Sequence, residues 1–139
     1  MADIKDALKE IVNELKNLRD LRYVPDEPTK TGIRYPFVVV YPETGEFKKL
    51  SAGFLTGLHN INIELHIMEK DLPRDYKQVI DLFQAIPKQL MSGQENARFS
   101  NGFTWETITY RFGPMIWAGV ETIGVTYTMV NAKVQDTVS

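Results

Sequence analysis

The sequence predicts an α+β fold in which two helices pack on one face of a largely antiparallel sheet of four or five strands, in the order α-β-β-α-β-β. Apolar residues recur with helical spacing in the N-terminal segment and again in the middle of the chain. β-branched and alternating runs lie between these two segments and after the second. A length of 139 residues suits one core, so we expect residues 1–139 to form a single domain.

The first helix is expected from Asp3 to about Leu18, with Asp3 as its N-cap. The apolar positions follow the spacing of one buried helix face and are Ile4, Ala7, Leu8, Ile11, Val12, Leu15 and Leu18. The charged positions assigned to the solvent side are Lys5, Lys9, Glu10, Glu14 and Lys16. An amphipathic helix of this length is stable only when it lies on another surface, which predicts a sheet beneath it.

The first half of the sheet is expected in residues 35–68. Residues 35–42 form a β-branched and aromatic run that is apolar on both faces, which predicts a central strand. Residues 43–57 are expected to form a long loop or a loose hairpin. Residues 58–68 alternate between apolar and polar side chains, which predicts a half-buried strand with Ile61, Ile63 and Leu65 on its buried face.

The second helix is expected to begin at Asp71, where a proline and acidic residues are typical of a first turn. Its apolar stripe continues to Met91, and Ser92-Gly93 is expected to end it. Pro87 lies inside this stretch and predicts a kink or a restart. A polar loop is expected over residues 94–102.

The remainder of the chain predicts a closing pair of strands. We expect a strand over 103–112, a turn at Gly113-Pro114 and a second, alternating strand over 117–130. Residues 131–139 are polar and without a period, so they are expected to form a flexible tail.

Composition restricts the class of protein. The 16 basic and 18 acidic residues give a net charge of -2, which argues against a strongly basic nucleic-acid-binding protein. A basic and aromatic patch of Arg34, Lys48, Lys49 and Phe54 is better interpreted as part of a solvated loop. The absence of cysteine excludes disulfides, cysteine nucleophiles and zinc–thiolate sites. With no apolar run typical of a signal peptide or a membrane span, we expect a soluble protein made in the cytoplasm.

The two histidines, His59 and His66, are seven residues apart on one predicted strand. This separation places them on opposite faces of the strand, where they cannot hold one metal ion together. His66 shares its face with Glu64. We interpret this pair as a polar contact on an exposed sheet surface rather than as an acid–base or ligand pair.

Other patterns of catalytic residues are incomplete. Glu106 and Glu121 would make a glycosidase-like pair if they faced each other across a hairpin, but nothing in the sequence places a cleft beside them. The glycines of residues 51–57 lack the Gly-Lys-Ser/Thr ending of a phosphate-binding loop. A nucleophile elbow and a dinucleotide fingerprint are both absent. We therefore expect no catalysis, no cofactor and no bound metal.

One face of the predicted sheet is polar but almost uncharged. It carries Asn60, Asn62, His66, Thr122, Thr126 and Thr128. Since two helices cover only one side of such a sheet, this second face meets either water or another subunit. Depletion of charge is typical of subunit interfaces, but threonine-rich faces are also common on exposed sheets, and composition does not decide between the two.

Several local strings, taken in the order of these elements, resemble a known family. They are Arg-Tyr-Pro-Phe-Val-Val-Val-Tyr-Pro at 34–42, Leu-His-Asn-Ile-Asn-Ile-Glu-Leu-His-Ile at 58–67 and Lys-Asp-Leu-Pro-Arg-Asp at 70–75. With the N-terminal amphipathic helix and the closing hairpin, they resemble the tail terminator, or tail completion, proteins of long-tailed bacteriophages and prophages. The resemblance extends from about Ile4 to Val130.

This resemblance implies a structural protein of the virion tail, made in the bacterial host cytoplasm. It implies a homo-oligomeric, hexameric ring that binds the last ring of tail tube protein, ends tube polymerisation and presents the surface for the head connector, or stopper, protein. It implies no catalytic residue, no membrane and no sequence-specific nucleic acid. The alternatives are another head–tail neck component and a small-molecule-binding α+β domain or enzyme with a pocket between helices and sheet.

Under this resemblance, the assembly contacts are assigned to residues 43–57 and to the uncharged sheet face. The candidate interface residues are Lys48, Lys49, Phe54, Leu55, Asn60, Asn62, His66, Thr126 and Thr128. Phe54 and Leu55 are apolar without an evident core position, although packing over the end of the helix layer is an alternative for them. The free subunit is expected to be a weakly associating monomer that assembles on the tube end.

Overall fold

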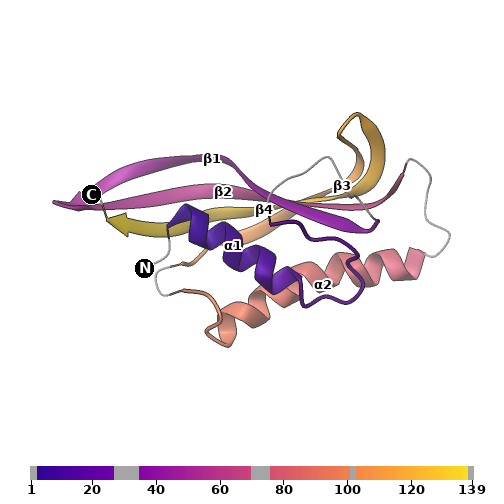
Figure 1. Ribbon diagram of the computed structural model, residues 1–139, viewed down its shortest axis with the longest axis horizontal. Helices are drawn as coiled ribbons and strands as arrows, with labels where there is room; N and C mark the ends of the chain where they lie inside the picture. The colour runs from indigo at the N-terminus through magenta and orange to yellow at the C-terminus, as the bar shows by residue number, and fades with distance from the viewer. Residues whose placement is uncertain (1–2, 27–34, 70–75, 101–102, 138–139) are drawn as a thin grey trace.

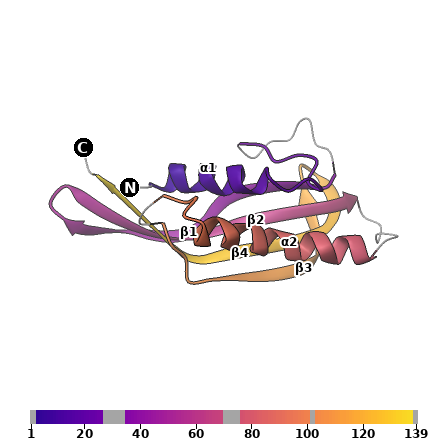
Figure 2. The same cartoon turned by 90° about the horizontal axis from the view of Figure 1, so that it is seen from below.

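The computed structural model describes residues 3–26, 35–69, 76–100 and 103–137. Its elements are α1 (Ile4–Leu15), β1 (Phe37–Ser51), β2 (Phe54–Glu69), α2 (Tyr76–Glu95), β3 (Thr107–Trp117) and β4 (Val120–Thr137). The strands form one antiparallel sheet in the order β1-β2-β4-β3, and both helices lie on the same face of it (Figure 1 and Figure 2). The predicted α+β class and element order are confirmed.

The core lies between the two helices and the helix-facing side of the sheet. Its buried side chains include Ala7, Ile11, Val12, Leu15, Val38, Val40, Ile61, Ile63, Leu65, Leu82, Ile86, Leu90, Val125, Tyr127 and Met129. The predicted alternation of β2 and β4 is therefore correct. The Tyr127 hydroxyl donates a hydrogen bond of 2.6 Å to the Phe83 carbonyl oxygen, which ties α2 to β4.

The start of α1 is confirmed, because the Asp3 side chain accepts a hydrogen bond of 2.8 Å from the Asp6 amide. The α-helix ends at Leu15, earlier than predicted. The amides of Asn17 and Leu18 instead donate to carbonyl oxygens three residues back, which makes tighter turns there. Apolar spacing alone places the buried face well and the end of the helix less well.

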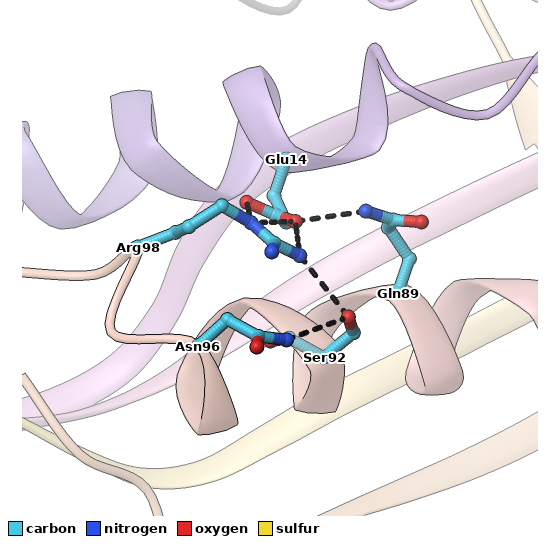
Figure 3. A network of polar contacts seen from close by, with 5 residues as sticks. All are labelled: Glu14, Gln89, Ser92, Asn96 and Arg98. Atoms are coloured by element: carbon cyan, nitrogen blue, oxygen red, sulfur yellow. Dashed lines mark hydrogen bonds and ion pairs between the residues drawn. The ribbon is translucent and has the colours of Figure 1, made fainter.

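Glu14 was assigned to the solvent side of α1, and this assignment is wrong, because the residue is only 5% exposed. Its carboxylate accepts hydrogen bonds of 3.0 Å from Arg98 Nε, 2.7 Å from Arg98 Nη2 and 2.8 Å from Gln89 Nε2 (Figure 3). The hydrogen bonds from Arg98 hold the pKa of Glu14 below its usual value, against the opposing effect of burial. The pair joins α1 to the segment that follows α2.

Gly93 lies inside α2, which continues to Glu95, so the predicted stop at Ser92-Gly93 is wrong. A Cβ atom at Gly93 would lie 2.9 Å from Glu14 Cδ and 2.8 Å from the Phe99 ring. The glycine therefore permits the close approach of the two side chains to α2. Phe99 is itself buried, although its segment was predicted to be a polar loop.

α2 continues through Pro87, so the predicted restart does not occur. Ile86 and Leu90, on either side of this proline, are both fully buried. Since packing of the apolar face supplies most of a helix's stability, these contacts hold the helix together where Pro87 removes a backbone hydrogen bond. The predicted start at Asp71 lies outside the described residues.

β1 is an edge strand rather than a central one. Of the two expectations for residues 43–57, a long loop or a loose hairpin, the hairpin is found: the end of β1 pairs with the start of β2. The register shifts between Pro42 and Thr44, and a proline at a bulge is tolerated on an edge because no neighbouring strand needs its amide. The apolar character of both faces has another cause. Phe37, on the face opposite the helices, is covered by a hairpin that includes β3, the strand at the other edge of the sheet.

That hairpin, β3–β4, turns at Ala118–Gly119 and not at Gly113-Pro114. Gly113 instead pairs with Gly124, and beyond this pair the hairpin curls to the side of the sheet opposite the helices (Figure 1). A Cβ atom on Gly124 would overlap the Leu65 carbonyl oxygen, and Gly113 has a φ of +155°. Two glycines therefore mark the bend, which sequence alone suggested was a turn.

β4 continues to Thr137, so residues 131–137 belong to the sheet and are not the flexible tail that we expected. Ala132 and Val134 are buried on the helix-facing side. Asn131 has a φ of +53°, and the β2–β4 register shifts at this level. The resulting bulge reverses the alternation of side chains, which explains why the sequence shows no period across it.

Replacing Leu15, which is fully buried, with alanine should lower the free energy of unfolding by about 2–5 kcal/mol, because the cavity adds to the lost transfer free energy. Urea denaturation measures the loss. Leu8→Ala, at a half-buried position of the same helix, is the control and should cost less. A loss below about 1 kcal/mol for Leu15→Ala, typical of surface positions, would contradict the packing of α1 described here.

Arg98→Met should destabilise the protein at neutral pH, because it leaves the buried Glu14 carboxylate without its main hydrogen-bond donor. Since folding lowers the pKa of Glu14, the stabilisation is complete above its ordinary pKa of 4.5 and is lost as pH falls through the lower folded value. The difference in urea midpoint between wild type and variant should therefore shrink in acid. A difference that stays constant between pH 7 and pH 3 would refute this role.

Candidate assembly site

The sheet face opposite the helices carries a polar network that crosses three strands. The Tyr41 hydroxyl donates to Glu64 Oε2, and Glu64 Oε1 lies 3.0 Å from His66 Nε2. His66 Nδ1 lies 2.6 Å from the hydroxyl oxygen of Thr122 on β4. The predicted contact between Glu64 and His66 is therefore present, together with two partners that the sequence did not indicate.

This part of the face is buried, contrary to our interpretation of an exposed surface. His66 has no exposed area and Glu64 is 9% exposed. Phe37 stacks on the His66 ring, with ring centroids 4.6 Å apart. Trp117 lies at the curled end of β3, and its ring centroid is 5.7 Å from that of His66 and 6.4 Å from that of Phe37. The chain covers this end of the face with its own hairpin.

Thr122, His66 and Glu64 have the connectivity of a nucleophile–base–acid relay. When the ionised Glu64 accepts the Nε2 proton, a neutral His66 presents Nδ1 as the acceptor for the Thr122 hydroxyl. Thr122, however, is only 1% exposed, so its hydroxyl lies within the packed face rather than in a cleft. The geometry supports a structural network that fixes the hairpin against the sheet.

The pKa values in the network follow from burial and hydrogen bonding. Burial on its own raises the pKa of Glu64, but hydrogen bonds from His66 and Tyr41 outweigh it and leave that pKa below its usual value. Burial and the bond to the Glu64 carboxylate raise the pKa of Tyr41 to about 12. Glu64 is therefore a carboxylate and Tyr41 a neutral phenol at neutral pH.

Beside the network, the curl of β3 forms one wall of an open hollow of about 490 Å³. Its lining is largely polar and includes Tyr41, Asn62, Arg111, Met115, Thr126 and Thr128. Of the candidate interface residues, Asn60, Thr126 and Thr128 are half-buried and remain accessible, whereas Asn62 and His66 are buried. The assignment of His66 to a contact surface is therefore wrong for the folded chain.

The remaining candidates lie on the β1–β2 arm, which we define as residues 44–58. This arm extends past the N-terminal end of α1, beyond the helix layer (Figure 1 and Figure 2). Lys48 and Lys49 are exposed, Phe54 is 40% exposed beside the turn, and Leu55 is half-buried. Neither apolar side chain belongs to the core formed by the described residues, so packing over the end of the helix layer is not what places them there.

Phe47 is the arm residue that the sequence analysis missed, and it is 66% exposed. It lies on the helix-facing side, where its ring meets the edge of the His59 ring at a centroid distance of 4.9 Å. A strand through residues 44–49 would have identified it, but this segment was expected to be a long loop or a loose hairpin, without assigned strand faces.

His59 and His66 lie on opposite faces of β2, as predicted from their spacing. His59 is 6% exposed and occupies a slot between Gly45 and Gly57, where any Cβ atom would overlap its ring. Burial lowers the pKa of His59. The ring therefore stays neutral at neutral pH and acts as a flat packing group in the arm.

The suggested glycosidase-like pair is not formed. Glu121 pairs with Ile116 beside the β3–β4 turn, whereas Glu106 precedes β3 at the other end of the hairpin. The Glu106 carboxylate accepts a hydrogen bond of 2.6 Å from the side-chain Nδ2 of Asn131. Across the described ranges, no three His, Cys, Asp or Glu side chains are arranged to hold a metal ion.

Comparison with known proteins does not assign the chain. No protein-family model matches it, and a search of curated proteins finds no significant match. Among the described helices, none combines the length and apolar character needed to cross a membrane.

Replacing Thr122 with valine should lower the free energy of unfolding by about 1–3 kcal/mol, because it leaves His66 Nδ1 buried without a partner. Thr126→Val on the same strand and face is the matched control. Its hydroxyl is half-buried with Met115 Sδ at 3.9 Å, so the expected loss is within about 0.5 kcal/mol. Equal losses in guanidinium denaturation would show that the Thr122–His66 bond does not fix the hairpin.

Proposed function

We propose that this protein is a tail terminator of a long-tailed bacteriophage or prophage, which forms a ring on the end of the tail tube and stops its growth. The β1–β2 arm is the observation that carries this proposal. It extends past the helix layer and presents Phe47 and Phe54, which are 66% and 40% exposed, beside Lys48 and Lys49. Large apolar side chains on a projecting hairpin favour a contact with another chain.

A closed ring needs a heterologous interface, in which each subunit offers one surface and receives a different one. The arm suits the offered surface because it lies at one end of the sheet. The β3–β4 hairpin curls at the other end, on the side opposite the helices (Figure 1). The polar hollow is lined by this hairpin and by β1 and β2. This separation within one chain supports contacts between successive copies rather than within one copy.

A different neck component would use the same features, and the two functions differ in phenotype. Loss of a terminator removes the stop on polymerisation, so tubes grow beyond their normal length. Loss of a later neck component leaves tubes of normal length that do not join heads. Tail length in particles assembled without the protein therefore separates the two.

Replacing Phe54 and Leu55 together with aspartate should leave the fold intact and prevent capping, because both side chains lie outside the core and charge opposes their burial in a contact. Tail length is measured by electron microscopy after complementation of a phage that lacks the wild-type gene, and the fold by circular dichroism. Met91→Asp is the control, since Met91 is 49% exposed on α2 and away from the arm.

The double variant should give overlong or uncapped tubes, and Met91→Asp tails of normal length. Unfolding of the double variant would place the pair in the core. A folded double variant that still yields tails of normal length joined to heads would contradict the role of the arm.

A further inference from the structure

The two outer edges of the sheet are unequally protected. Near its start, β1 is paired on its outer side, where the Val38 amide donates a hydrogen bond of 3.0 Å to the Tyr23 carbonyl oxygen. Farther along, residues 44–50 have no strand on that side within the described part of the chain. β3 likewise has no strand beyond it there. An edge with unpaired amides and carbonyls is a template for a further strand.

The directions of the strands fit a head-to-tail pairing of these two edges. Every neighbouring pair in the order β1-β2-β4-β3 is antiparallel, so β1 and β3 run in opposite directions. A second copy placed beside the first in the same orientation would therefore bring its β1 antiparallel to β3, with both helix layers on one side. The same step can be repeated from copy to copy, as a ring requires.

We propose that residues 44–50 of one copy pair with residues 107–113 of the next copy, in the register that places Glu46 opposite Arg111. This inference rests on the proposed ring and specifies the contact between its subunits. Strand addition supplies backbone hydrogen bonds, and the side chains fix the register.

Charge selects this register. Glu46 pairs with Leu58 in β2, and Arg111 pairs with Thr126 in β4, so both lie on the sheet face opposite the helices, and both are exposed. A shift of two residues in one direction would place Lys48 opposite Arg111. A shift of two residues in the other direction would place the uncharged Thr44 opposite Arg111. Opposite charges across neighbouring strands stabilise a pair, and like charges destabilise it.

The same register aligns the exposed aromatic residues and the irregular points of both strands. Phe47 comes to lie opposite Tyr110 on the helix-facing side, and these side chains are 66% and 62% exposed in the single chain. The bulge of β1 between Pro42 and Thr44 then meets β3 at Gly113, where the β3–β4 hairpin bends away. Pairing therefore covers the straight part of β3 and ends at the bend of β3 and the register shift of β1.

Disulfide trapping tests this register, because the chain has no cysteine of its own. Glu46→Cys and Arg111→Cys proteins, mixed and oxidised, should give a covalent dimer that contains one chain of each. A chain that carries both substitutions should give a ladder of covalent oligomers. Within one chain the two positions lie on opposite edges of the sheet, separated by about 14 Å across three strand spacings and by about 20 Å along the strands, because Glu46 is level with Lys133 of β4 and Arg111 with Thr126. This separation is beyond the reach of a disulfide.

Two controls make the result specific. Glu46→Cys mixed with Thr107→Cys, four residues out of register on the same face, should give at least about tenfold less linked product, because the sulfurs are held apart by more than one strand repeat. Each single variant oxidised alone should give none. Circular dichroism confirms that all variants fold.

Efficient linkage in the mixed sample alone supports the edge pairing. Linkage of Arg111→Cys with itself would indicate a two-fold pairing of β3 with β3 and overturn the proposal. Absence of the mixed product overturns it as well. If rings are nevertheless seen on tails, the proposed function stands and only the contact is wrong. If linkage occurs but tails end normally without this protein, the contact stands and the function is wrong.

Discussion

Two helices cover only one face of a four-stranded sheet, and this limit shapes the rest of the molecule. The helix-facing side forms the apolar core, while the helices do not cover the opposite face or the two edges of the sheet. Part of that face is covered by the chain itself. The β3–β4 hairpin bends at the Gly113–Gly124 pair and brings Trp117 over Phe37 and His66. Within the described residues, the polar hollow, the arm, the outer edge of β3 and the outer edge of β1 beyond its start stay uncovered.

The covered part of the face is polar, although burial of polar groups is costly unless each finds a partner. Tyr41, Glu64, His66 and Thr122 supply one another with donors and acceptors, so a single carboxylate is stabilised without a salt bridge to lysine or arginine. Such a network adds little net free energy of folding, but its directional hydrogen bonds fix how the strands are placed. It holds β4 in one position relative to β2 at the point where the hairpin leaves the sheet. The Glu14–Arg98 pair acts in a comparable way between the helix layer and the segment after α2.

Side-chain periodicity in the sequence was sufficient to predict α1, β2, the central part of β4 and the faces that they bury, because each of these elements keeps one period along its length. Two errors in the bounds of strands lie where backbone geometry departs from regularity. The bulge at Asn131 hid the end of β4, and the Gly113–Gly124 bend resembled a turn. Of the candidate site, the spacing of Glu64 and His66 predicted their contact but not its burial, since the covering residue Trp117 is some fifty positions away in sequence. Phe47 was missed because residues 43–57 were expected as a long loop or a loose hairpin, and no strand faces were assigned within them.

The exposed arm and the outer edges of the sheet are two different surfaces that one copy leaves uncovered, and we propose that successive copies cover them in a closed ring. Sedimentation velocity over a wide range of protein concentrations, with negative-stain images of the fastest species, tests this claim most directly. Weak contacts in a closed ring predict a monomer in concentration-dependent exchange with one larger species that appears as rings. A monomer at every concentration, a two-fold dimer or an open-ended series of polymers would contradict it.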